Sequence, residues 1–298
     1  MQNFRGEDLN LFEKYFTETK NTCIACNSKK INLWAKSGNF KAVRCTECGL
    51  IWMNPYCNGI GLTSYYNNYI GKRRTNNEKK MIQRAVQYKL DAQFIEIFFS
   101  QGKILDVGCN GGFFLDAMSE KFEKYGIEID LEAVNYAKEK YSKFGENIHN
   151  CSIENAPFSN NFFDAIVMRG TIEHMLDPLN AIKKASYMLK SQGLFFICAT
   201  PNGKSFSADL YRDQWTLFHP VQHIWHFSRE NLKLIAEKFG LQLVAWDYPY
   251  LGTPYENVKE NIKDVLEAIK LQEKGFQHKM EVSPPYYENM MSLVFQKN

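Results

Sequence analysis

Four cysteines near the N-terminus have the spacing of a metal site. Cys23 and Cys26 form one C-x2-C pair, Cys45 and Cys48 form a second, and 18 residues separate the two pairs. Two such pairs supply the four thiolates of a tetrahedral site, which leaves no coordination position open for catalysis. The spacing therefore predicts a structural Zn²⁺ site, with iron as the alternative ion, and Cys57 stays unassigned.

A second candidate for a functional site is the run ILDVGCNGGFFL at residues 104–115, which predicts a strand that turns sharply into a helix. A nicotinamide or flavin site would carry G-x-G-x-x-G at such a turn. Starting at Gly108, the chain has Asn110 and Phe113 where the second and third glycines would stand. Dinucleotide binding is therefore disfavoured.

Two acidic residues near this turn indicate a different ligand. Asp106 ends the predicted strand, and Glu128 ends the next one, twenty residues after Gly108. A carboxylate at the second position can accept hydrogen bonds from both hydroxyls of a ribose. One ribose and a glycine-rich turn without a pyrophosphate cradle fit S-adenosylmethionine (SAM), whose ammonium group Asp106 could contact through water.

Candidate bases for a transfer reaction follow later strands. Glu173 and His174 come just after a predicted strand, at the sheet edge where ligands bind. His223 belongs to the segment LFHPVQHIWHFS at residues 217–228. His174 and His223 are candidates for acceptor contact or for the general base, with Glu173 beside them. Each has a structural role as its alternative, and the Glu173–His174 pair could also help to bind a divalent metal.

Strands and helices alternate around these residues, which predicts a doubly wound, mostly parallel α/β sheet. A helix with apolar residues at helical spacing precedes the sheet, and the aromatic, polar stretch 63–77 reads as a linker. Two final strands, at 241–248 and 290–297, flank a helix near 256–273. The remaining expected strands are 103–108, 124–129, 147–152, 163–168 and 194–200, and the expected helices are about 112–122, 131–143, 178–190 and 229–239.

Charge is unevenly distributed along the 298 residues. Residues 20–90 contain 13 Lys and Arg against two acidic residues, a balance of +11, whereas the rest of the chain carries 23 basic and 31 acidic residues. A basic N-terminal part can face an anionic partner, such as nucleic acid or a phosphorylated small molecule, and the alternative is a merely solvated basic face. The sequence contains no apolar stretch long enough to span a membrane and no signal-peptide pattern, so a cytoplasmic protein is expected.

Together, these motifs resemble the class I SAM-dependent methyltransferases, whose turn usually reads D/E-x-G-x-G-x-G. Here the pattern is Asp106, Gly108, Asn110 and Gly112, and asparagine tolerates the left-handed backbone that the middle glycine adopts. The resemblance continues in CSIENAPF at residues 151–158, where Ser152 replaces an aspartate that usually meets the adenine amino group. It implies a Rossmann-like, seven-stranded sheet, and it implies that the backbone of the next residue, Ile153, contacts the adenine ring.

The N-terminal pattern, with GLIWMNP after the second cysteine pair, is similar to a bacterial methyltransferase group linked to surface-polysaccharide or modified-sugar biosynthesis. The order of the motifs predicts a zinc ribbon at 1–70, a linker helix at 71–99 and a methyltransferase domain at 100–298 with acceptor-capping insertions at about 203–228 and 250–287. The resemblance to this group suggests the class of acceptor, an anionic sugar such as a sugar nucleotide or sugar phosphate. The alternatives are an RNA methyltransferase that uses the basic ribbon to grip RNA, and a non-catalytic SAM-binding protein.

Overall fold

The computed structural model describes residues 9–66, 78–275 and 288–298. The chain divides into two compact units, each assembled from separate stretches of sequence. Unit 1 contains residues 1–65, 201–234 and 248–291, and unit 2 contains residues 66–200, 235–247 and 292–298. The segments expected to cap the acceptor therefore group with the N-terminal cysteine region.

Unit 2 is built on the predicted seven-stranded sheet, with strand order β12-β13-β10-β9-β6-β7-β8. The four central contacts β10–β9, β9–β6, β6–β7 and β7–β8 are parallel, and β12 pairs antiparallel with β13. The carboxyl ends of these parallel strands therefore meet at one edge. The strands are β6 (Gly102–Val107), β7 (Phe122–Glu128), β8 (Ile148–Asn150), β9 (Phe163–Arg169), β10 (Leu189–Pro201), β12 (Leu241–Asp247) and β13 (Met290–Lys297).

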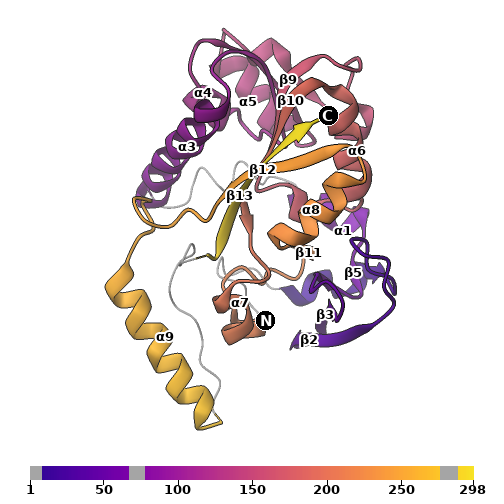
Figure 1. Ribbon diagram of the computed structural model, residues 1–298, viewed down its shortest axis with the longest axis vertical. Coiled ribbons are helices and arrows are strands. Elements are labelled where there is room, and N and C mark those ends of the chain that lie inside the picture. The colour runs from indigo at the N-terminus through magenta and orange to yellow at the C-terminus, as the bar shows by residue number, and fades with distance from the viewer. Residues whose placement is uncertain (1–8, 67–77, 276–287) are drawn as a thin grey trace. The chain divides into compact units, whose positions relative to one another are not determined.

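The helices that connect the strands cover both faces of this sheet and pack against its apolar residues. The central strands are almost continuous apolar runs, as expected for parallel strands that are covered on both sides. Ile104, Val167 and Phe196 from three strands pack in one core with Ala92 and Ile95 from α3. Figure 1 shows α3 alongside α4, and the two helices are in contact. The helices are α3 (Glu78–Phe98), α4 (Phe113–Ala117), α5 (Leu131–Lys140), α6 (Pro178–Met188) and α8 (Arg229–Glu237).

Several predicted elements have other bounds in the structure; for example, β10 begins at Leu189 rather than at 194. Helix α4 ends at Ala117 rather than near 122, because the next strand already begins at Phe122. Residues 63–66 of the expected linker are helical, at the end of α1 (Gly59–Tyr66), where Leu62 and Tyr65 are buried. Burial of these apolar side chains outweighs the weak helical pattern of the segment. Residues 67–77 of the same expected linker lie outside the described residues.

Unit 1 contains a small antiparallel sheet with strand order β11-β4-β3-β2. Strand β11 follows the other three in sequence by more than half of the chain and pairs with β4 through Trp225 opposite Trp52. Both tryptophans are almost fully buried and their rings lie 6.4 Å apart. The strands are β2 (Ile31–Ser37), β3 (Phe40–Cys45), β4 (Ile51–Met53) and β11 (Trp225–His226), and β1 (Phe16–Glu18) pairs with β5 (Tyr56–Cys57).

Among the described residues, unit 1 also contains α7 (Phe206–Tyr211) and α9 (Val258–Glu273), besides nearly all of α1 and the first part of α8. The expected helix near 256–273 is therefore present, while residues 276–287 of the second expected insertion lie outside the described residues. Across the described ranges, 9–66, 78–275 and 288–298, no helix combines the length and the apolar composition that crossing a bilayer requires.

Candidate functional site

The glycine-rich turn between β6 and α4 has the backbone shape that the sequence predicts. Gly108 and Gly112 have φ values of 78° and 77°, and Asn110 has a φ of 50°. Asparagine therefore occupies the left-handed conformation in place of the expected glycine. The amides of Gly108 and Cys109 both donate to the carbonyl of Ile127, which fixes the turn against the end of β7.

Glu128 holds this turn from the neighbouring strand. One carboxylate oxygen accepts a hydrogen bond from the amide of Asn110 at 2.8 Å, and the other accepts from the amides of Ile129 and Asp130 at 2.8 and 3.0 Å. Burial raises the pKa of Glu128, and the three amide hydrogen bonds oppose that rise. A carboxylate oxygen has two acceptor positions, so the oxygen bonded to Asn110 can also accept from a ligand hydroxyl.

Asp106 lies under the turn as a buried, incompletely hydrogen-bonded carboxyl group. Its side chain is 2% exposed, and its Oδ1 has no hydrogen-bond partner among the described residues. Burial raises the pKa of Asp106 to about 7, although the charge of Arg169 opposes the increase. A buried acceptor without a donor is costly, and the sites where proteins keep one are often ligand sites. A bound ammonium group would supply both the donor and the compensating charge.

Ser152 and Ile153 stand at the same edge of the sheet, directly after β8. They begin a short 3₁₀ turn over Ile153–Asn155, in which Ser152 is the capping residue and Ile153 is buried. The sheet order therefore brings together the ends of β6, β7 and β8, where every predicted cofactor residue lies. Their binding of a cofactor remains a prediction.

Glu173 and His174 follow β9 at the same edge, in a 3₁₀ turn over Ile172–His174. The carboxyl group of Glu173 is 2% exposed and accepts a hydrogen bond from the hydroxyl of Thr200 at 3.3 Å. Burial raises the pKa of Glu173 to about 8, against the effects of Thr200 and Arg169, so Glu173 is mostly protonated at pH 7. The Nε2 atom of His174 lies 3.9 Å from Oε1 of Glu173, and its ring packs edge-on against Tyr66.

His223, the other candidate base, belongs to unit 1. It is buried, and its Nδ1 atom lies 2.7 Å from the carbonyl oxygen of Leu217. A carbonyl can only accept, so Nδ1 carries the proton, and the neutral ring therefore has its lone pair on Nε2. The ring is edge-on to His219 at 4.9 Å and to His226 at 6.1 Å.

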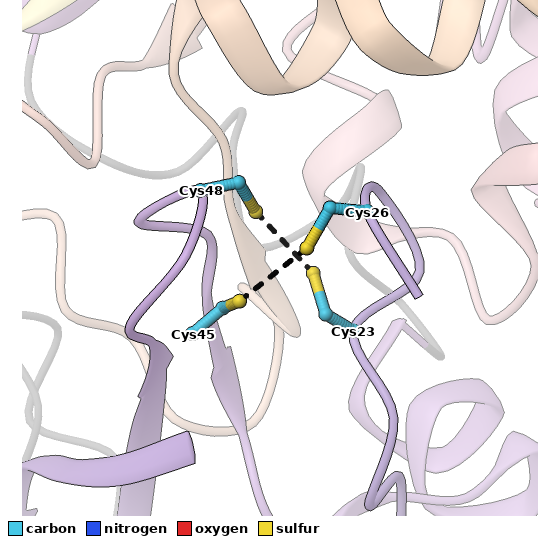
Figure 2. Close-up of side chains that lie close together, drawn as sticks. All are labelled: Cys23, Cys26, Cys45 and Cys48. Atoms are coloured by element: carbon cyan, nitrogen blue, oxygen red, sulfur yellow. Dashed lines mark hydrogen bonds between the residues drawn. The ribbon is translucent and has the colours of Figure 1, made fainter. Parts of the chain in front are cut away.

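The four cysteines of unit 1 converge as the spacing predicts (Figure 2). The sulfur atoms of Cys23 and Cys48 lie 3.4 Å apart, those of Cys26 and Cys45 lie 3.5 Å apart, and all four fall within 4.8 Å of one another. Sulfur ligands at the usual zinc–sulfur distance stand about 3.8 Å apart in a tetrahedron. The contact between Cys23 and Cys48 lowers the pKa of Cys23 and raises the pKa of Cys48, so one of these two thiols ionises before the other. The cluster fits Zn²⁺.

Each cysteine pair is held by a tight backbone turn. The amide of Asn27 donates to the carbonyl of Cys23, and the amide of Gly49 donates to the carbonyl of Cys45. Both donors have left-handed backbones, with φ values of 62° and 77°. Glycine therefore suits the second turn, and asparagine is the non-glycine residue that best tolerates the first.

The second turn is also tied to a distant segment of unit 1. The side-chain amide of Asn231 donates to the carbonyl of Cys48 at 2.8 Å. The side-chain oxygen of Asn231 accepts from the amide of Ser228, and the hydroxyl of Ser228 accepts from the amide of Asn231. This reciprocal cap begins α8 directly after β11, so the cysteine cluster and the expected acceptor segment share one hydrogen-bond network.

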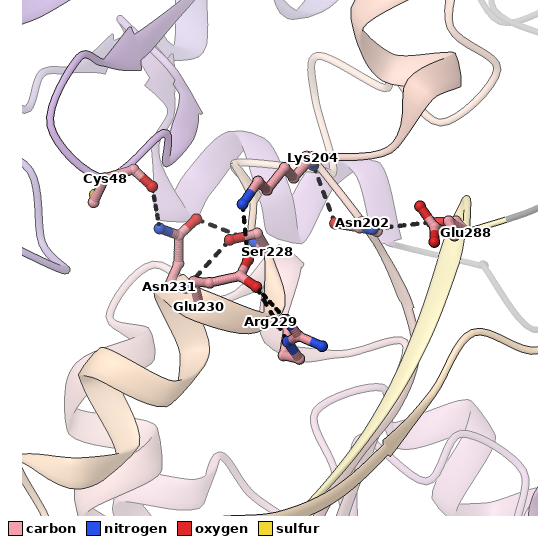
Figure 3. A network of polar contacts seen from close by, with 8 residues as sticks. All are labelled: Cys48, Asn202, Lys204, Ser228, Arg229, Glu230, Asn231 and Glu288. Atoms are coloured by element: carbon pink, nitrogen blue, oxygen red, sulfur yellow. Dashed lines mark hydrogen bonds and ion pairs between the residues drawn. The ribbon is translucent and has the colours of Figure 1, made fainter.

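Figure 3 shows that charged side chains extend this network. Glu230 accepts from Arg229 at 2.7 Å and lies 3.6 Å from the ammonium of Lys204. The amide of Lys204 donates to Asn202, whose side chain donates to the carbonyl of Glu288 at 3.0 Å. The sequence pattern S-x-x-N at 228–231 signals the cap, but nothing in the sequence signals its link to Cys48.

His226 of β11 occupies an unusual environment inside unit 1. Its ring lies 5.5 Å from that of Trp215, 5.8 Å from Phe218 and 6.1 Å from Trp34. It is 1% exposed, and neither ring nitrogen has a hydrogen-bond partner within the described part of the chain. This burial lowers the pKa of His226 to about 3, so the ring is neutral at physiological pH.

Two charged residues of unit 2 lie outside the predicted site. Arg169 ends β9, and its Nε donates to the carboxylate of Asp91 from α3 at 2.6 Å. The other oxygen of Asp91 accepts from the side chain of Gln87 at 2.9 Å, and the Arg169 guanidinium lies over the ring of Tyr88 at 4.4 Å. Two features of the sequence could have indicated this ion pair: an arginine at the end of an apolar strand, and an aspartate among the apolar residues of a helix.

Comparisons with known proteins agree with the fold of unit 2. A family model described as a methyltransferase domain matches residues 78–245. The fold is similar to that of a SAM-dependent methyltransferase from Thermotoga maritima, with a TM-score of 0.51 and 18% identity over 80% of this chain and 99% of that one. A chain from the Haloferax volcanii complex of the Trm112 methyltransferase activator with a methyltransferase gives a TM-score of 0.53 and 13% identity over 75% of this chain and 94% of that one.

Curated relatives match parts of the chain. A ubiquinone biosynthesis O-methyltransferase from Haemophilus ducreyi is 30% identical over 32% of this chain and 44% of its own length. A tRNA U34 carboxymethyltransferase from Campylobacter hominis is 30% identical over 39% of this chain and 41% of its own. The biotin biosynthesis bifunctional protein BioHC from Teredinibacter turnerae is 25% identical over 48% of this chain and 27% of its own. The chain thus spans less than half the length of each of these relatives.

Proposed function

Because the chain belongs to the methyltransferase domain family, we propose that it transfers a methyl group from SAM to a small-molecule acceptor. The observation that carries this proposal is the edge formed by β6, β7 and β8. There, a glycine-rich turn lies between Asp106, which has a buried acceptor, and Glu128, which can take a further hydroxyl. These groups suit the ammonium and the ribose of one ligand.

The chemistry is an in-line displacement at a sulfonium methyl group. A lone pair of the acceptor forms the new bond to the methyl carbon, and the carbon–sulfur bond breaks with its electron pair going to sulfur. The acceptor's proton, where it has one to lose, passes to a base. SAM supplies the activated methyl group, and the protein supplies alignment, exclusion of water and the base.

Glu173, His174 and His223 remain the candidate bases. Glu173 is a poor base at pH 7, since its pKa is raised to about 8 and it is mostly protonated. The 3.9 Å between Oε1 of Glu173 and Nε2 of His174 is too long for a direct hydrogen bond. His174 is the more exposed of the two, at 22%, and is therefore better placed to accept a proton from a substrate.

For the acceptor, we propose an anionic sugar, nucleotide-linked or phosphorylated, in surface-polysaccharide biosynthesis in the cytoplasm. The basic character of residues 20–90 supports an anionic acceptor, and the resemblance of the N-terminal cysteine pattern supports a sugar. We further propose that Cys23, Cys26, Cys45 and Cys48 hold structural Zn²⁺. RNA is the second candidate, because the same basic stretch would bind its phosphates and one relative is a tRNA-modifying enzyme by name.

A transfer assay with methyl-labelled SAM tests both acceptors. The purified protein would be incubated with bacterial cytosolic extract, and products would be separated into RNA and small anionic metabolites. We expect label in the sugar-nucleotide or sugar-phosphate fraction, and none with an Asp106→Ala variant. Label that ribonuclease releases would replace the sugar with RNA. Failure of the wild-type protein to bind SAM would contradict the methyltransferase proposal itself.

A further inference from the structure

The order of the strands defines where each end of a bound SAM molecule would lie. Glu128 ends β7 and Ser152 follows β8, so the ribose and the adenine would lie on that side of β6. Strand β9 is the neighbour of β6 on the opposite side, with Asp106 opposite Val167. A ligand extended along this edge therefore directs its amino-acid end toward the end of β9.

Arg169 lies at the end of β9 and can donate further hydrogen bonds. Its side chain is 18% exposed, and its hydrogen bond to Asp91 uses only the Nε donor. A guanidinium has five N–H donors in a planar fork, so among the described residues its two terminal nitrogens are left for a second carboxylate. The ring of Tyr88 covers one face of the guanidinium, which fixes the plane of the fork.

Arg169 also lies close to the site already described. Its charge opposes the rise in pKa of both Asp106 and Glu173, so its field reaches the carboxyl groups on either side of the β6–β9 edge. Asp106 Oδ1, Asn110 Oδ1 and Gln87 Oε1 are buried and have no hydrogen-bond partner in the described part of the chain. The edge thus combines one cation with several unsatisfied acceptors.

This combination matches an α-amino acid. An α-carboxylate needs a cationic donor, and an α-ammonium needs acceptors. We propose that Arg169, positioned by Asp91 of α3, binds the α-carboxylate of SAM, while Asp106 accepts from its α-ammonium. The inference deepens the proposed function on which it rests, and it makes α3 part of the cofactor site.

Binding measurements on two ligands test this role without any acceptor. SAM and decarboxylated SAM differ only in the carboxylate. Replacing Arg169 alone would leave Asp91, which is 5% exposed, without its counter-charge, so the main variant is Arg169→Gln combined with Asp91→Asn. We expect titration calorimetry to show SAM affinity reduced roughly 30- to 100-fold, as for a lost charged hydrogen-bond pair. Affinity for decarboxylated SAM should stay constant, because the double variant removes one positive and one negative charge and this ligand has no carboxylate for Arg169 to bind.

The same strand offers a matched control. Asp164 lies near the start of β9, where Arg169 ends it, and pairs with Lys190 at 2.7 Å. Replacing that pair with Asn and Gln removes equal charge at the opposite edge of the sheet and should change neither affinity. A single Arg169→Lys variant keeps the positive charge but loses the planar pair of terminal donors. Its SAM affinity should lie between that of the wild type and that of the Arg169→Gln, Asp91→Asn variant.

Two results would overturn the inference. Equal loss of affinity for SAM and decarboxylated SAM would make Arg169 and Asp91 a structural pair, and no loss for either would remove Arg169 from the cofactor site. In both cases wild-type SAM binding would leave the proposed function standing. Wild-type protein that binds neither ligand would remove the proposed function and this inference with it.

Discussion

The cofactor edge of unit 2 and the cysteine cluster of unit 1 are both buried polar sites, but they satisfy their polar atoms differently. At the edge, Asp106, Asn110 and Gln87 each keep a buried acceptor without a donor among the described residues. At the cluster, the thiols contact one another and the carbonyl of Cys48 accepts from Asn231. Under the proposed function, the first site would receive a charged ligand that binds and dissociates, whereas the second would hold a resident metal ion.

Removing the metal site should give the largest effect. A Cys45→Ser, Cys48→Ser variant should contain no zinc, where the wild type contains about one per chain by elemental analysis. Unit 1 should then lose its cooperative unfolding transition, because zinc binding is worth roughly 10 kcal/mol or more in structural sites. Affinity for S-adenosylhomocysteine should change less than about 3-fold, because the predicted cofactor residues belong to the other compact unit. Two outcomes would contradict the proposed difference between the two sites. One is that the variant retains zinc, and the other is that it loses zinc and S-adenosylhomocysteine binding together.

A change at Glu128 should weaken cofactor binding and leave the metal site intact. In Glu128→Gln, the side-chain amide would point N–H donors at backbone amides that now donate to the carboxylate. Affinity for S-adenosylhomocysteine should fall on the order of 100-fold by calorimetry, with the zinc content unchanged. Glu123→Gln is the matched control, because Glu123 lies in the same strand but is 51% exposed. Equal effects from the two variants would remove Glu128 from the cofactor site.

The link between Asn231 and Cys48 should have a smaller effect. Asn231→Ala removes the donor to Cys48 and half of the cap of α8, and it should lower the unfolding free energy by about 2 kcal/mol. Zinc should also dissociate faster into a chelator. The neighbouring Glu230→Ala breaks only partly exposed ion pairs and should cost less than about 0.5 kcal/mol. Similar losses from both variants would show that the link to Cys48 is unimportant.

His226 should give the smallest effect, visible only in acid. Its folded pKa of about 3 is below the usual value, so the unfolded chain takes up a proton first as the pH falls below about 6.5. Stability due to the neutral ring is present above that value and is lost as the pH falls, by about 1.4 kcal/mol at pH 5.5. His226→Phe should flatten this part of the pH dependence in chemical denaturation. Parallel pH profiles for the variant and the wild type would refute the assignment to His226.

Local sequence predicted the sheet and the shape of the turn well. Apolar runs and their order were enough for all seven strands of unit 2, and asparagine at position 110 adopts the left-handed backbone expected of it. Helix α4 was overestimated because its apolar pattern continues past Ala117, where the chain turns into β7. Patterns with short sequence separation are therefore the reliable ones in this chain.

Contacts between distant segments could not be predicted. Arg169 and Asp91 are far apart in the sequence, and neither belongs to a motif, so only the packing of α3 beside β9 reveals their ion pair. In the same way, Asn231 reads as an ordinary helix-capping residue until its bond to Cys48 is known. Long-range polar pairs depend on the tertiary fold, which a single sequence does not encode in local patterns.

The pairing of β4 with β11 has a consequence for the newly made protein. Strand β4 is complete at Met53, but its partner at Trp225 and His226 leaves the ribosome much later. At about 5–20 residues per second, that interval is on the order of 10 to 35 seconds. During this time the cysteines can already take up metal while the edge of β4, with Trp52, stays open to other strands. The nascent chain therefore has a period in which chaperone protection matters most.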